Sequence, residues 1–433
     1  MKDKIIQLAL SLQSELVTLR RDFHRFAEAG WTEFRTASIV AQRLESLGYK
    51  VLVGEDVIDE AAMMGVPGAE ELDIHMERAK AQGAHLSYLD KMKGGKTGVV
   101  GVLETGKAGP VIGLRFDMDA NDLNESSEES HRPYKEGFSS INKGAMHACG
   151  HDGHTAVGLG VAKILMEFKQ EFSGTIKLIF QPAEEGVRGA ASMTAKGIVD
   201  DVNYLLGMHL GSYGKEKGAL FCGSNGFLAT SKLDAHFKGV PAHAGAKPEE
   251  GKSALLAAAA AAISMQGIYR HSAGASRINV GLLQAGTGRN VVPDNALIKI
   301  ETRGVSSEID DFVKNEAQRM IRASAAMYDV EVVIKEAGGA KSGTSDEDLI
   351  FLVRDEGEKS GLFNVIQDSI VSGGSEDFTY FMDRVQKNGG KATFFRLDTT
   401  IAAPAHNSSF DFDEDVLSKG AAMFVLMVHR LTH

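Results

Sequence analysis

Val111-Ile-Gly-Leu-Arg-Phe-Asp-Met-Asp119 is a short, almost continuous apolar run that ends in two acidic residues. Such a run is typical of a strand covered on both faces of a sheet, because a half-exposed strand alternates apolar and polar residues. Similar runs recur at residues 98–103, 175–180, 204–208 and 392–397. Helical segments, notably residues 154–170, lie between them, so the pattern predicts an α/β fold with a mainly parallel sheet.

Polar side chains follow three of these predicted strands at the point where each strand ends. Asp117 and Asp119 end the run that begins at Val111. Glu184 and Glu185 follow the run at residues 175–180, and His209 follows the run at residues 204–208. In open α/β sheets, ligands bind in the crevice outside the carboxyl ends of the strands. The sequence therefore predicts that these groups meet in one crevice.

Residues 227–336 have a different pattern, with predicted strands and helices in the order βαββαβ. This is the order of a split ferredoxin-like unit. Signals of a sheet and of a site resume after it, and a chain of 433 residues is longer than a single core usually supports. We expect a discontinuous metal-binding domain of residues 1–226 and 337–433, interrupted by an inserted domain of residues 227–336. A charged stretch at about residues 55–96 is expected to be a surface insertion.

Charge and cysteine content argue against several classes of protein. A formal net charge of -11 with no basic run disfavours binding to nucleic acid and to anionic membranes. No window approaches the roughly 18 consecutive apolar residues that a membrane span needs. The two cysteines, Cys149 and Cys222, are too few for a disulfide framework and are typical of a reducing compartment. We expect a soluble cytoplasmic protein.

Met146-His-Ala-Cys-Gly-His-Asp-Gly-His154 concentrates imidazoles, a thiol and a carboxylate. In an extended or tightly turned backbone residues i and i+2 face the same way, so Cys149 and His151 can bind one ion or two neighbouring ions. The other ligands must come from elsewhere in the chain, and the candidates are Glu185, His209 and His406. A lone histidine such as His209 or His406 is more often a core or loop residue, and only its partners change that expectation. Thiolate and imidazole favour zinc, with manganese, cobalt or nickel possible according to supply.

Glu184 and Glu185 are adjacent carboxylates that project differently, so one can bind a metal while the other acts as a general base. Two ions about 3.5–4 Å apart polarise a carbonyl and lower the pKa of water, which suits amide hydrolysis. Alternatively, Cys149 is a nucleophile, since histidines and an aspartate lie nearby in the sequence. The metal site is preferred because a nucleophilic thiol does not need the two glutamates or distant histidines. His151 is also badly placed to deprotonate a thiol two residues away.

These motifs together resemble those of the dinuclear metallopeptidase superfamily of carboxypeptidase G type, specifically its amidohydrolase branch with aminoacylases and indole-acetyl-amino-acid hydrolases. The resemblance implies a catalytic domain of dinuclear aminopeptidase-like type and a lid or dimerisation domain. The matching segments span nearly the whole chain in order. They are Arg21-Asp-Phe-His24, Arg115-Phe-Asp-Met-Asp119, residues 146–154, Gln181-Pro-Ala-Glu-Glu185, Met208-His209, Gly239-Val-Pro-Ala-His-Ala244, Asn290-Val-Val-Pro293 and Gly374-Ser-Glu-Asp-Phe378.

The resemblance implies roles in the catalytic domain residue by residue. Glu184 matches the general base of the family, and Asp119 matches an outer carboxylate that orients a ligand. His147, Asp152 and His154 match no ligand position and are expected to give structural support. Five positions match the metal ligands of the family: Cys149, His151, Glu185, His209 and His406.

Three further roles are implied in the inserted domain. His243 matches a histidine that reaches the site of a neighbouring subunit, where it would hydrogen-bond the oxyanion. Asn290 and Arg303 match lid residues that hold the substrate, and the guanidinium of Arg303 suits an α-carboxylate. For Arg303 the alternative is an ordinary ion pair at a strand end.

The resemblance implies an enzyme that uses two divalent ions, Mn²⁺ or Zn²⁺ with Co²⁺ or Ni²⁺ possible, to cleave the amide of an N-acyl amino acid. p-Aminobenzoyl-glutamate, a folate breakdown product, is the expected substrate, and acetyl, benzoyl and indole-acetyl amides stay open. The expected protein partners are a second copy of this chain, bound through the lid domain, or a homologous B subunit. The alternative is a metal-loaded but inactive member of a heteromer. It is disfavoured because every catalytic position is filled.

Overall fold

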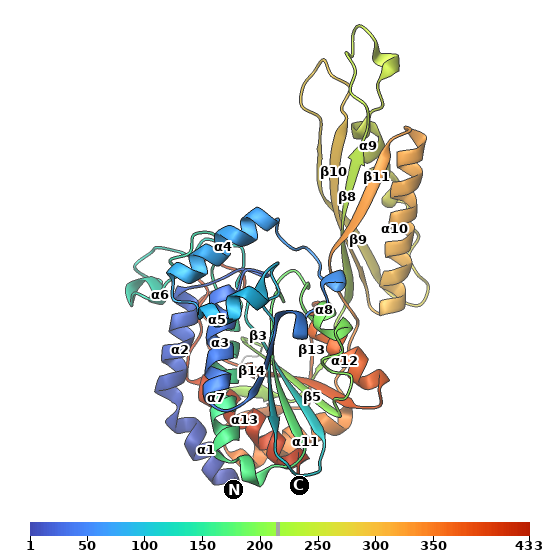
Figure 1. The fold of residues 1–433 in the computed structure, drawn as a ribbon. Coiled ribbons are helices and arrows are strands. Elements are labelled where there is room, and N and C mark those ends of the chain that lie inside the picture. Colours follow the sequence, from blue (N-terminus) through green and yellow to red (C-terminus); the bar gives the residue numbers. More distant parts are fainter. Residues whose placement is uncertain (214–216) are drawn as a thin grey trace. The chain divides into compact units, whose positions relative to one another are not determined.

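The computed structural model describes residues 1–213 and 217–433, which divide into two units (Figure 1). The first unit comprises Met1–Asn225, Thr344–Ser372 and Asp377–His433, and the second comprises Gly226–Gly343 and Gly373–Glu376. The predicted inserted domain lies inside the second unit. Within these described ranges, no helix combines the length and the apolar character that crossing a membrane requires.

The described part of the first unit contains a central sheet with the strand order β1-β2-β4-β3-β5-β14-β6-β12. The neighbours β4, β3, β5 and β14 in its middle run parallel. The pairs β1–β2, β2–β4 and β14–β6 are antiparallel. The α/β fold with its mainly parallel centre is confirmed. The strands are β1 (Lys50–Val53), β2 (Val99–Glu104), β3 (Val111–Asp117), β4 (Thr175–Gln181), β5 (Tyr204–Gly211), β6 (Ala219–Phe221), β12 (Val365–Gln367) and β14 (Lys391–Asp398).

Two helices, α7 (His151–Glu167) and α13 (Val416–Leu431), pack on the middle of this sheet. The ring of Phe116 in β3 lies 5.3 Å from that of Phe180 in β4 and 5.0 Å from that of Phe424 in α13. A Cβ on Gly158 of α7 would lie 2.7 Å from the Phe180 ring, so only glycine permits this close approach. This packing fixes the start of α7 beside the ends of β3 and β4.

Helix α7 begins at His151, earlier than the residue 154 start predicted from the sequence. Gly150 precedes it with φ 92°, a left-handed conformation that suits glycine. The first-turn residues His151, Asp152 and His154 are buried by polar partners rather than by apolar packing. The apolar periodicity therefore starts later than the helix, which explains the difference.

The second unit contains a four-stranded antiparallel sheet with the strand order β11-β8-β10-β9. Its core forms where alternating residues of β8, such as Leu233, Ala235 and Phe237, pack against the alanine-rich face of α9. The order of elements is the βαββαβ order of the ferredoxin-like unit. They are β8 (Ala229–Lys238), α9 (Ala254–Met265), β9 (Ser276–Ala285), β10 (Asn295–Gly304), α10 (Ser307–Met327) and β11 (Glu331–Ala340).

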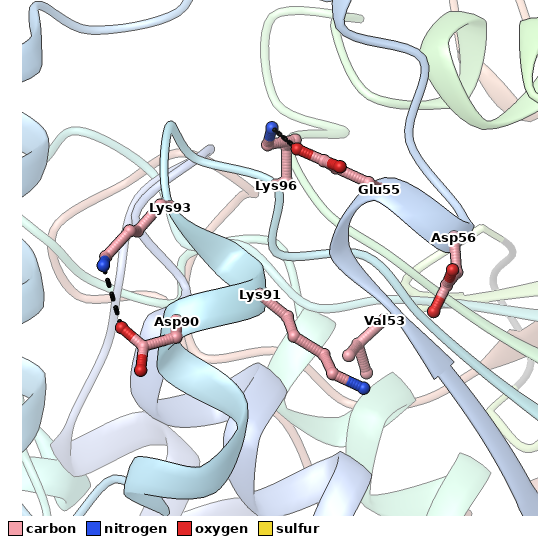
Figure 2. A pocket seen from close by; sticks show the side chains of 7 residues that line it. All are labelled: Val53, Glu55, Asp56, Asp90, Lys91, Lys93 and Lys96. Carbon is pink, nitrogen blue, oxygen red and sulfur yellow. Dashed lines mark hydrogen bonds and ion pairs between the residues drawn. The ribbon is translucent and has the colours of Figure 1, made fainter.

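The stretch at residues 55–96 carries α4 (Ala69–Ala81) and α5 (Leu86–Leu89), joined by turns. Leu72 and Met92 enter the core, so the stretch is anchored to the first unit. Figure 2 shows a hollow beside it, lined by Val53, Glu55, Asp56, Asp90, Lys91, Lys93 and Lys96. Lys96 Nζ lies 2.8 Å from Glu55 Oε1, and Lys93 Nζ lies 2.9 Å from Asp90 Oδ1. Both ion pairs join residues within the stretch at residues 55–96.

Candidate active site

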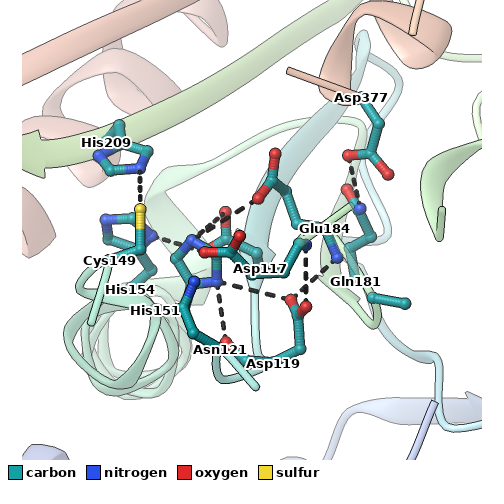
Figure 3. A network of polar contacts seen from close by, with 12 residues as sticks. Asp117, Asp119, Asn121, Cys149, His151, His154, Gln181, Glu184, His209 and Asp377 are labelled. Carbon is teal, nitrogen blue, oxygen red and sulfur yellow. Dashed lines mark hydrogen bonds and ion pairs between the residues drawn. The ribbon is translucent and has the colours of Figure 1, made fainter. Parts of the chain in front are cut away.

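The ends of β3, β4 and β5 and the start of α7 bring the predicted polar groups together in the first unit. Figure 3 shows Asp117, Asp119, His151 and Glu184 directed toward one another, with Cys149 and His209 beside them. Asp117, Asp119 and His151 are almost completely buried, and Glu184 is 9 % exposed. His406, from the loop after β14, is the exposed member. The predicted crevice at the carboxyl ends of the strands is thus a cluster of buried acids and imidazoles.

The five predicted metal ligands form two sets of side chains that share Cys149. One set is Cys149, His151 and His209, and the other is Cys149, Glu185 and His406. Within each set the potential ligand atoms lie within 4.8 Å of one another. The shared member contacts His209, with Cys149 Sγ 3.4 Å from His209 Nε2. Two adjoining sets of thiolate, imidazole and carboxylate are a donor combination suited to two neighbouring transition-metal ions.

The histidines of the first set are held with one nitrogen directed into the cluster. His151 Nδ1 lies 2.9 Å from the carbonyl oxygen of Asp119, so Nδ1 carries a proton and donates it to that carbonyl. His209 Nδ1 likewise donates to the carbonyl oxygen of Leu210, at 2.6 Å. Metal-binding histidines are commonly oriented in this way. His151 Nε2 is buried and makes no hydrogen bond to the described residues, and coordination to a metal ion would satisfy this nitrogen.

The electrostatics of the cluster favour a cation. Hydrogen bonds to Cys149 and Glu185 raise the pKa of His406 to about 10. Burial lowers the pKa of His151, but the nearby Asp117, Asp119 and Cys149 outweigh burial and hold this pKa well above its usual value. Both shifts arise from nearby acidic groups, whereas burial and the charges of His154 and Arg396 hold the pKa of His209 well below its usual value. The donor set and its charge therefore fit divalent metal ions.

Asp119 acts on the acidic pair through the backbone. Its Oδ1 accepts a hydrogen bond from the N–H of Glu184, and its Oδ2 accepts one from the N–H of Glu185, each at 2.9 Å. Both glutamate side chains lie near His151, since one potential ligand atom of each of the three residues lies within 4.8 Å of the others. Glu184 Oε2 lies 3.9 Å from His151 Nε2, and Glu185 Oε1 lies 3.3 Å from His406 Nε2. The contact with His406 distinguishes Glu185 as a candidate metal ligand and leaves Glu184 as the candidate for handling protons.

Asp117 and His154 form a buried pair beneath the cluster. His154 Nδ1 lies 2.5 Å from Asp117 Oδ1, while His154 Nε2 accepts the N–H of Leu210 at 3.0 Å. Arg115 donates to Asp117 Oδ2 at 2.6 Å. Burial raises the pKa of Asp117, but the charges of Arg115, His151 and His154 hold it well below its usual value. Asp117 is thus an ionised carboxylate engaged by its neighbours.

Sequence reasoning assigned no role to Arg115, Gln181 or Asp377, which form a further buried network. Arg115 Nε donates to Gln181 Oε1 at 2.7 Å. Gln181 Nε2 in turn donates to Asp377 Oδ1 at 2.8 Å, as Figure 3 shows. Arg115 is 1 % exposed and sits within an apolar strand. An arginine in such a run is the signal that points to buried acidic partners.

His243, Asn290 and Arg303 lie in the second unit. The loops that carry His243 and Asn290 are neighbours, since Ala244 N–H donates to the carbonyl oxygen of Asn290 at 2.9 Å. His243 Nδ1 accepts the N–H groups of Gly245 and Ala246, so its Nε2 carries the proton. Arg303 is ion-paired with Glu301 at 2.7 Å, which is the alternative considered for it.

Comparison with known proteins identifies a family. The model of Peptidase family M20/M25/M40 matches residues 113–430. The chain is 49% identical over 417 residues to the A subunit of p-aminobenzoyl-glutamate hydrolase from Escherichia coli, covering 96% of this chain and 95% of that protein. It is 48% identical over 408 residues to indole-3-acetyl-aspartic acid hydrolase of Enterobacter agglomerans, covering 94% and 93%. The crystal structure of an aminobenzoyl-glutamate utilization protein from Klebsiella pneumoniae superposes with a TM-score of 0.85 at 41% identity, covering 99% and 97% of the two chains.

Proposed function

The chain belongs to Peptidase family M20/M25/M40 and is a metal-dependent amidohydrolase, and we propose that it hydrolyses p-aminobenzoyl-glutamate to p-aminobenzoate and glutamate. The observation that carries the proposal is the pair Glu184 and Glu185, which Asp119 holds through two backbone N–H groups beside the thiol and imidazoles. One carboxylate that binds metal and one that transfers protons suit a metal-dependent hydrolysis of amides.

We assign the metal-binding role to a thiolate, a carboxylate and three imidazoles, which would hold two divalent ions, Mn²⁺ or Zn²⁺ with Co²⁺ or Ni²⁺ as alternatives. These residues are Cys149, His151, Glu185, His209 and His406. When bound, such ions polarise an amide carbonyl and lower the pKa of water. Asp119 contributes by holding the backbone of the acidic pair in place.

The protons are handled by Glu184 in this proposal. Its carboxylate takes a proton from the attacking water and passes it to the nitrogen of the departing amino acid. Nε2–H of His243 from a neighbouring subunit donates to the carbonyl oxygen as negative charge develops there. Asn290 and Arg303 bind the substrate in this proposal. Arg303 leaves its ion pair with Glu301 and binds the α-carboxylate of the substrate.

The names of the two relatives described above support a narrower class of substrate. One is named for an amide of p-aminobenzoate with glutamate, and the other for an amide of indole-acetate with aspartate. Both compounds join an aromatic acyl group to an acidic amino acid. We therefore place aromatic acyl amides of glutamate or aspartate ahead of acetyl amides, with p-aminobenzoyl-glutamate first.

The test is release of the amino acid by the purified chain loaded with Zn²⁺ or Mn²⁺. We expect the highest kcat/KM with p-aminobenzoyl-glutamate, then indole-acetyl-aspartate and benzoyl-glycine, and the lowest with acetyl-glutamate. A chelator should abolish release, and added metal should restore it. Metal-loaded protein that releases no amino acid from any of these amides, both alone and with a homologous B subunit, would contradict the proposal.

The assembly is proposed from the same relatives. The Escherichia coli relative is named as the A subunit of its enzyme, which supports a heteromer with a homologous B subunit, and a homodimer through the second unit is the alternative. We propose a cytoplasmic location, in keeping with only two cysteines. Release that appears only after co-expression with a second, homologous chain would show that this chain alone is the inactive, metal-loaded member of a heteromer.

A further inference from the structure

The loop between β4 and α8 (Ala190–Ala195) carries both Glu184 and Glu185 on a strained backbone. Ala183, directly before the pair, has φ 51°, and Val187, after it, has φ 59°. Residues with a Cβ rarely adopt this left-handed conformation, and it persists only where surrounding contacts hold it. The aim of the two glutamates therefore depends on whatever fixes this loop.

Glu33 is one of the groups that hold it. This residue precedes α3 (Phe34–Ser46) and is 0 % exposed. Its Oε1 accepts the N–H of the strained Ala183 at 2.8 Å. The next two N–H groups donate to Asp119. Three successive backbone N–H groups of the loop thus end on two buried carboxyl groups, one of them from a distant part of the sequence.

The turn that carries Glu33 also packs directly on the loop. A Cβ on Gly30 would lie 3.0 Å from the Cα of Ala183, so the two backbones are almost in contact. The far end of the loop is held similarly, because Asp377 Oδ2 accepts the N–H groups of Gly189 at 3.0 Å and Ala190 at 2.9 Å. The loop is therefore fixed at both ends by buried carboxyl groups.

Burial and the charge of Asp119 raise the pKa of Glu33 to about 8. A neutral carboxyl group can accept the N–H of Ala183 with one oxygen. The hydroxyl of Thr97 donates to the other oxygen, with Thr97 Oγ1 2.7 Å from Glu33 Oε2. The carboxamide of glutamine keeps an oxygen that accepts the N–H of Ala183, and its N–H groups can donate to the Thr97 hydroxyl oxygen. Glutamine is therefore a conservative variant that keeps both contacts.

We propose that Glu33 is a positioning residue for amide hydrolysis: its hydrogen bond to Ala183 fixes the strained turn that aims Glu184 and Glu185. Glu33 contacts neither substrate nor metal in this role and acts through the loop. The inference rests on the function proposed for the two glutamates.

The experiment compares Glu33→Ala and Glu33→Gln with the wild-type chain. We expect Glu33→Ala to lower kcat at saturating Zn²⁺ by about 10–100-fold, with KM changed by less than about threefold, since small misplacements of catalytic groups act mainly on kcat. Zn²⁺ affinity, measured by competition with a chelating dye, should fall about tenfold because the loop carries Glu185. Glu33→Gln should restore both quantities.

Glu356 provides a matched control, because it is a buried carboxylate that binds Lys2 at 2.6 Å and has no role at the site. Glu356→Ala should lower the unfolding temperature while leaving kcat and Zn²⁺ affinity unchanged. Wild-type kcat and affinity in Glu33→Ala, or a Glu33→Gln variant as impaired as Glu33→Ala, would overturn the proposal.

If Glu33→Ala does not fold, Glu33→Asp takes its place, since it keeps the acid but shortens its reach to Ala183. The same losses in Glu33→Asp support the proposal, and wild-type behaviour refutes it. The Zn²⁺ measurement separates this inference from the function. If the wild-type chain hydrolyses no amide but Glu33→Ala still weakens Zn²⁺ binding, the function is wrong and the positioning role stands.

Discussion

Adjacent residues at this site have different environments, and the environment sets the role of each. Glu184 and Glu185 are chemically identical and both lie near His151, yet Glu185 also contacts His406, at 3.3 Å. The two cysteines differ in the same way. Cys149 belongs to both sets of potential ligands, whereas Cys222 lies in the core, where burial raises the pKa of its thiol to about 12.

The adjacent glutamates allow the base and the ligand to be tested separately. We expect Glu184→Ala to lower kcat by about 10²–10⁴-fold while both metal ions stay bound, because only proton transfer is lost. Glu185→Ala should instead lower the metal content. Turnover and metal content of the purified variants measure the two effects. An active Glu184→Ala enzyme would refute the assigned base.

The two cysteines form a second matched pair. Cys149→Ala should reduce Zn²⁺ affinity about 10-fold or more, since it removes the ligand shared by both sets. Cys222→Ala should leave Zn²⁺ binding unchanged, because this thiol faces apolar neighbours. Equilibrium dialysis of Zn²⁺ against each variant measures the difference. Full metal binding by Cys149→Ala would instead favour the alternative hypothesis, in which Cys149 is a nucleophile.

At the scale of elements, a buried ion network joins segments that lie far apart in the sequence. Arg20 of α2 (Gln13–Arg25) is 0 % exposed. It donates to Asp152 at the start of α7 at 2.8 Å and to Asp411 at 2.9 Å and Glu414 at 3.1 Å, just before α13. These bonds tie the first turn of α7, which follows Cys149 and carries His151, to α2 and to the segment just before α13.

Removing the centre of this network should cost stability. Arg20→Met removes one cationic partner from three buried carboxylates, which keep contacts with His24, Arg132 and Arg21. We expect the free energy of unfolding to fall by about 3 kcal/mol. Burial raises the pKa of Asp411, but the nearby Arg132 and Arg20 lower this pKa by a larger amount. The folded-state pKa of Asp411 therefore lies below the usual value. Its stabilising contribution is present above the unfolded-state pKa and is lost as pH falls through the folded-state pKa.

The same network predicts a pH dependence that a thermal melt can record. The unfolding temperature of the wild-type chain should fall on acidification below about pH 4, and Asp411→Asn should show a shallower fall.

Urea titrations at neutral pH measure the loss of unfolding free energy in Arg20→Met. An Arg20→Met variant as stable as the wild type would contradict the role given to the network.

At the scale of the whole molecule, the chain combines a metal-binding unit with a ferredoxin-like unit that carries His243, Asn290 and Arg303. The proposal that His243 serves the site of a second copy of the chain makes each active site dependent on two chains. A symmetric dimer would then contain two equivalent sites of this kind.

Mixing two inactive variants tests this dependence. His243→Ala and Glu184→Ala should each lack turnover in isolation. If His243 acts on the partner's site, a random mixture of the two should recover about a quarter of wild-type activity, because half of the dimers are mixed and each contains one intact site. Turnover after exchange of chains between dimers is the measurement. If a mixture shown to exchange chains recovers no activity, His243 acts in the active site of its own chain or has no role in the reaction.

Sequence alone determined the layered α/β fold, the βαββαβ order and the candidate ligands, because apolar periodicity and motif spacing are local properties of the chain. Residues 175–180 and 204–208, for example, became β4 and β5 with nearly the predicted bounds. Only the tertiary structure decided that Cys149 is shared by two sets of ligands, that Asp119 holds the backbone of the acidic pair, and that Glu33 holds Ala183. Those contacts join segments distant in the chain, and their partners are chosen by how strands and helices pack rather than by spacing along the sequence.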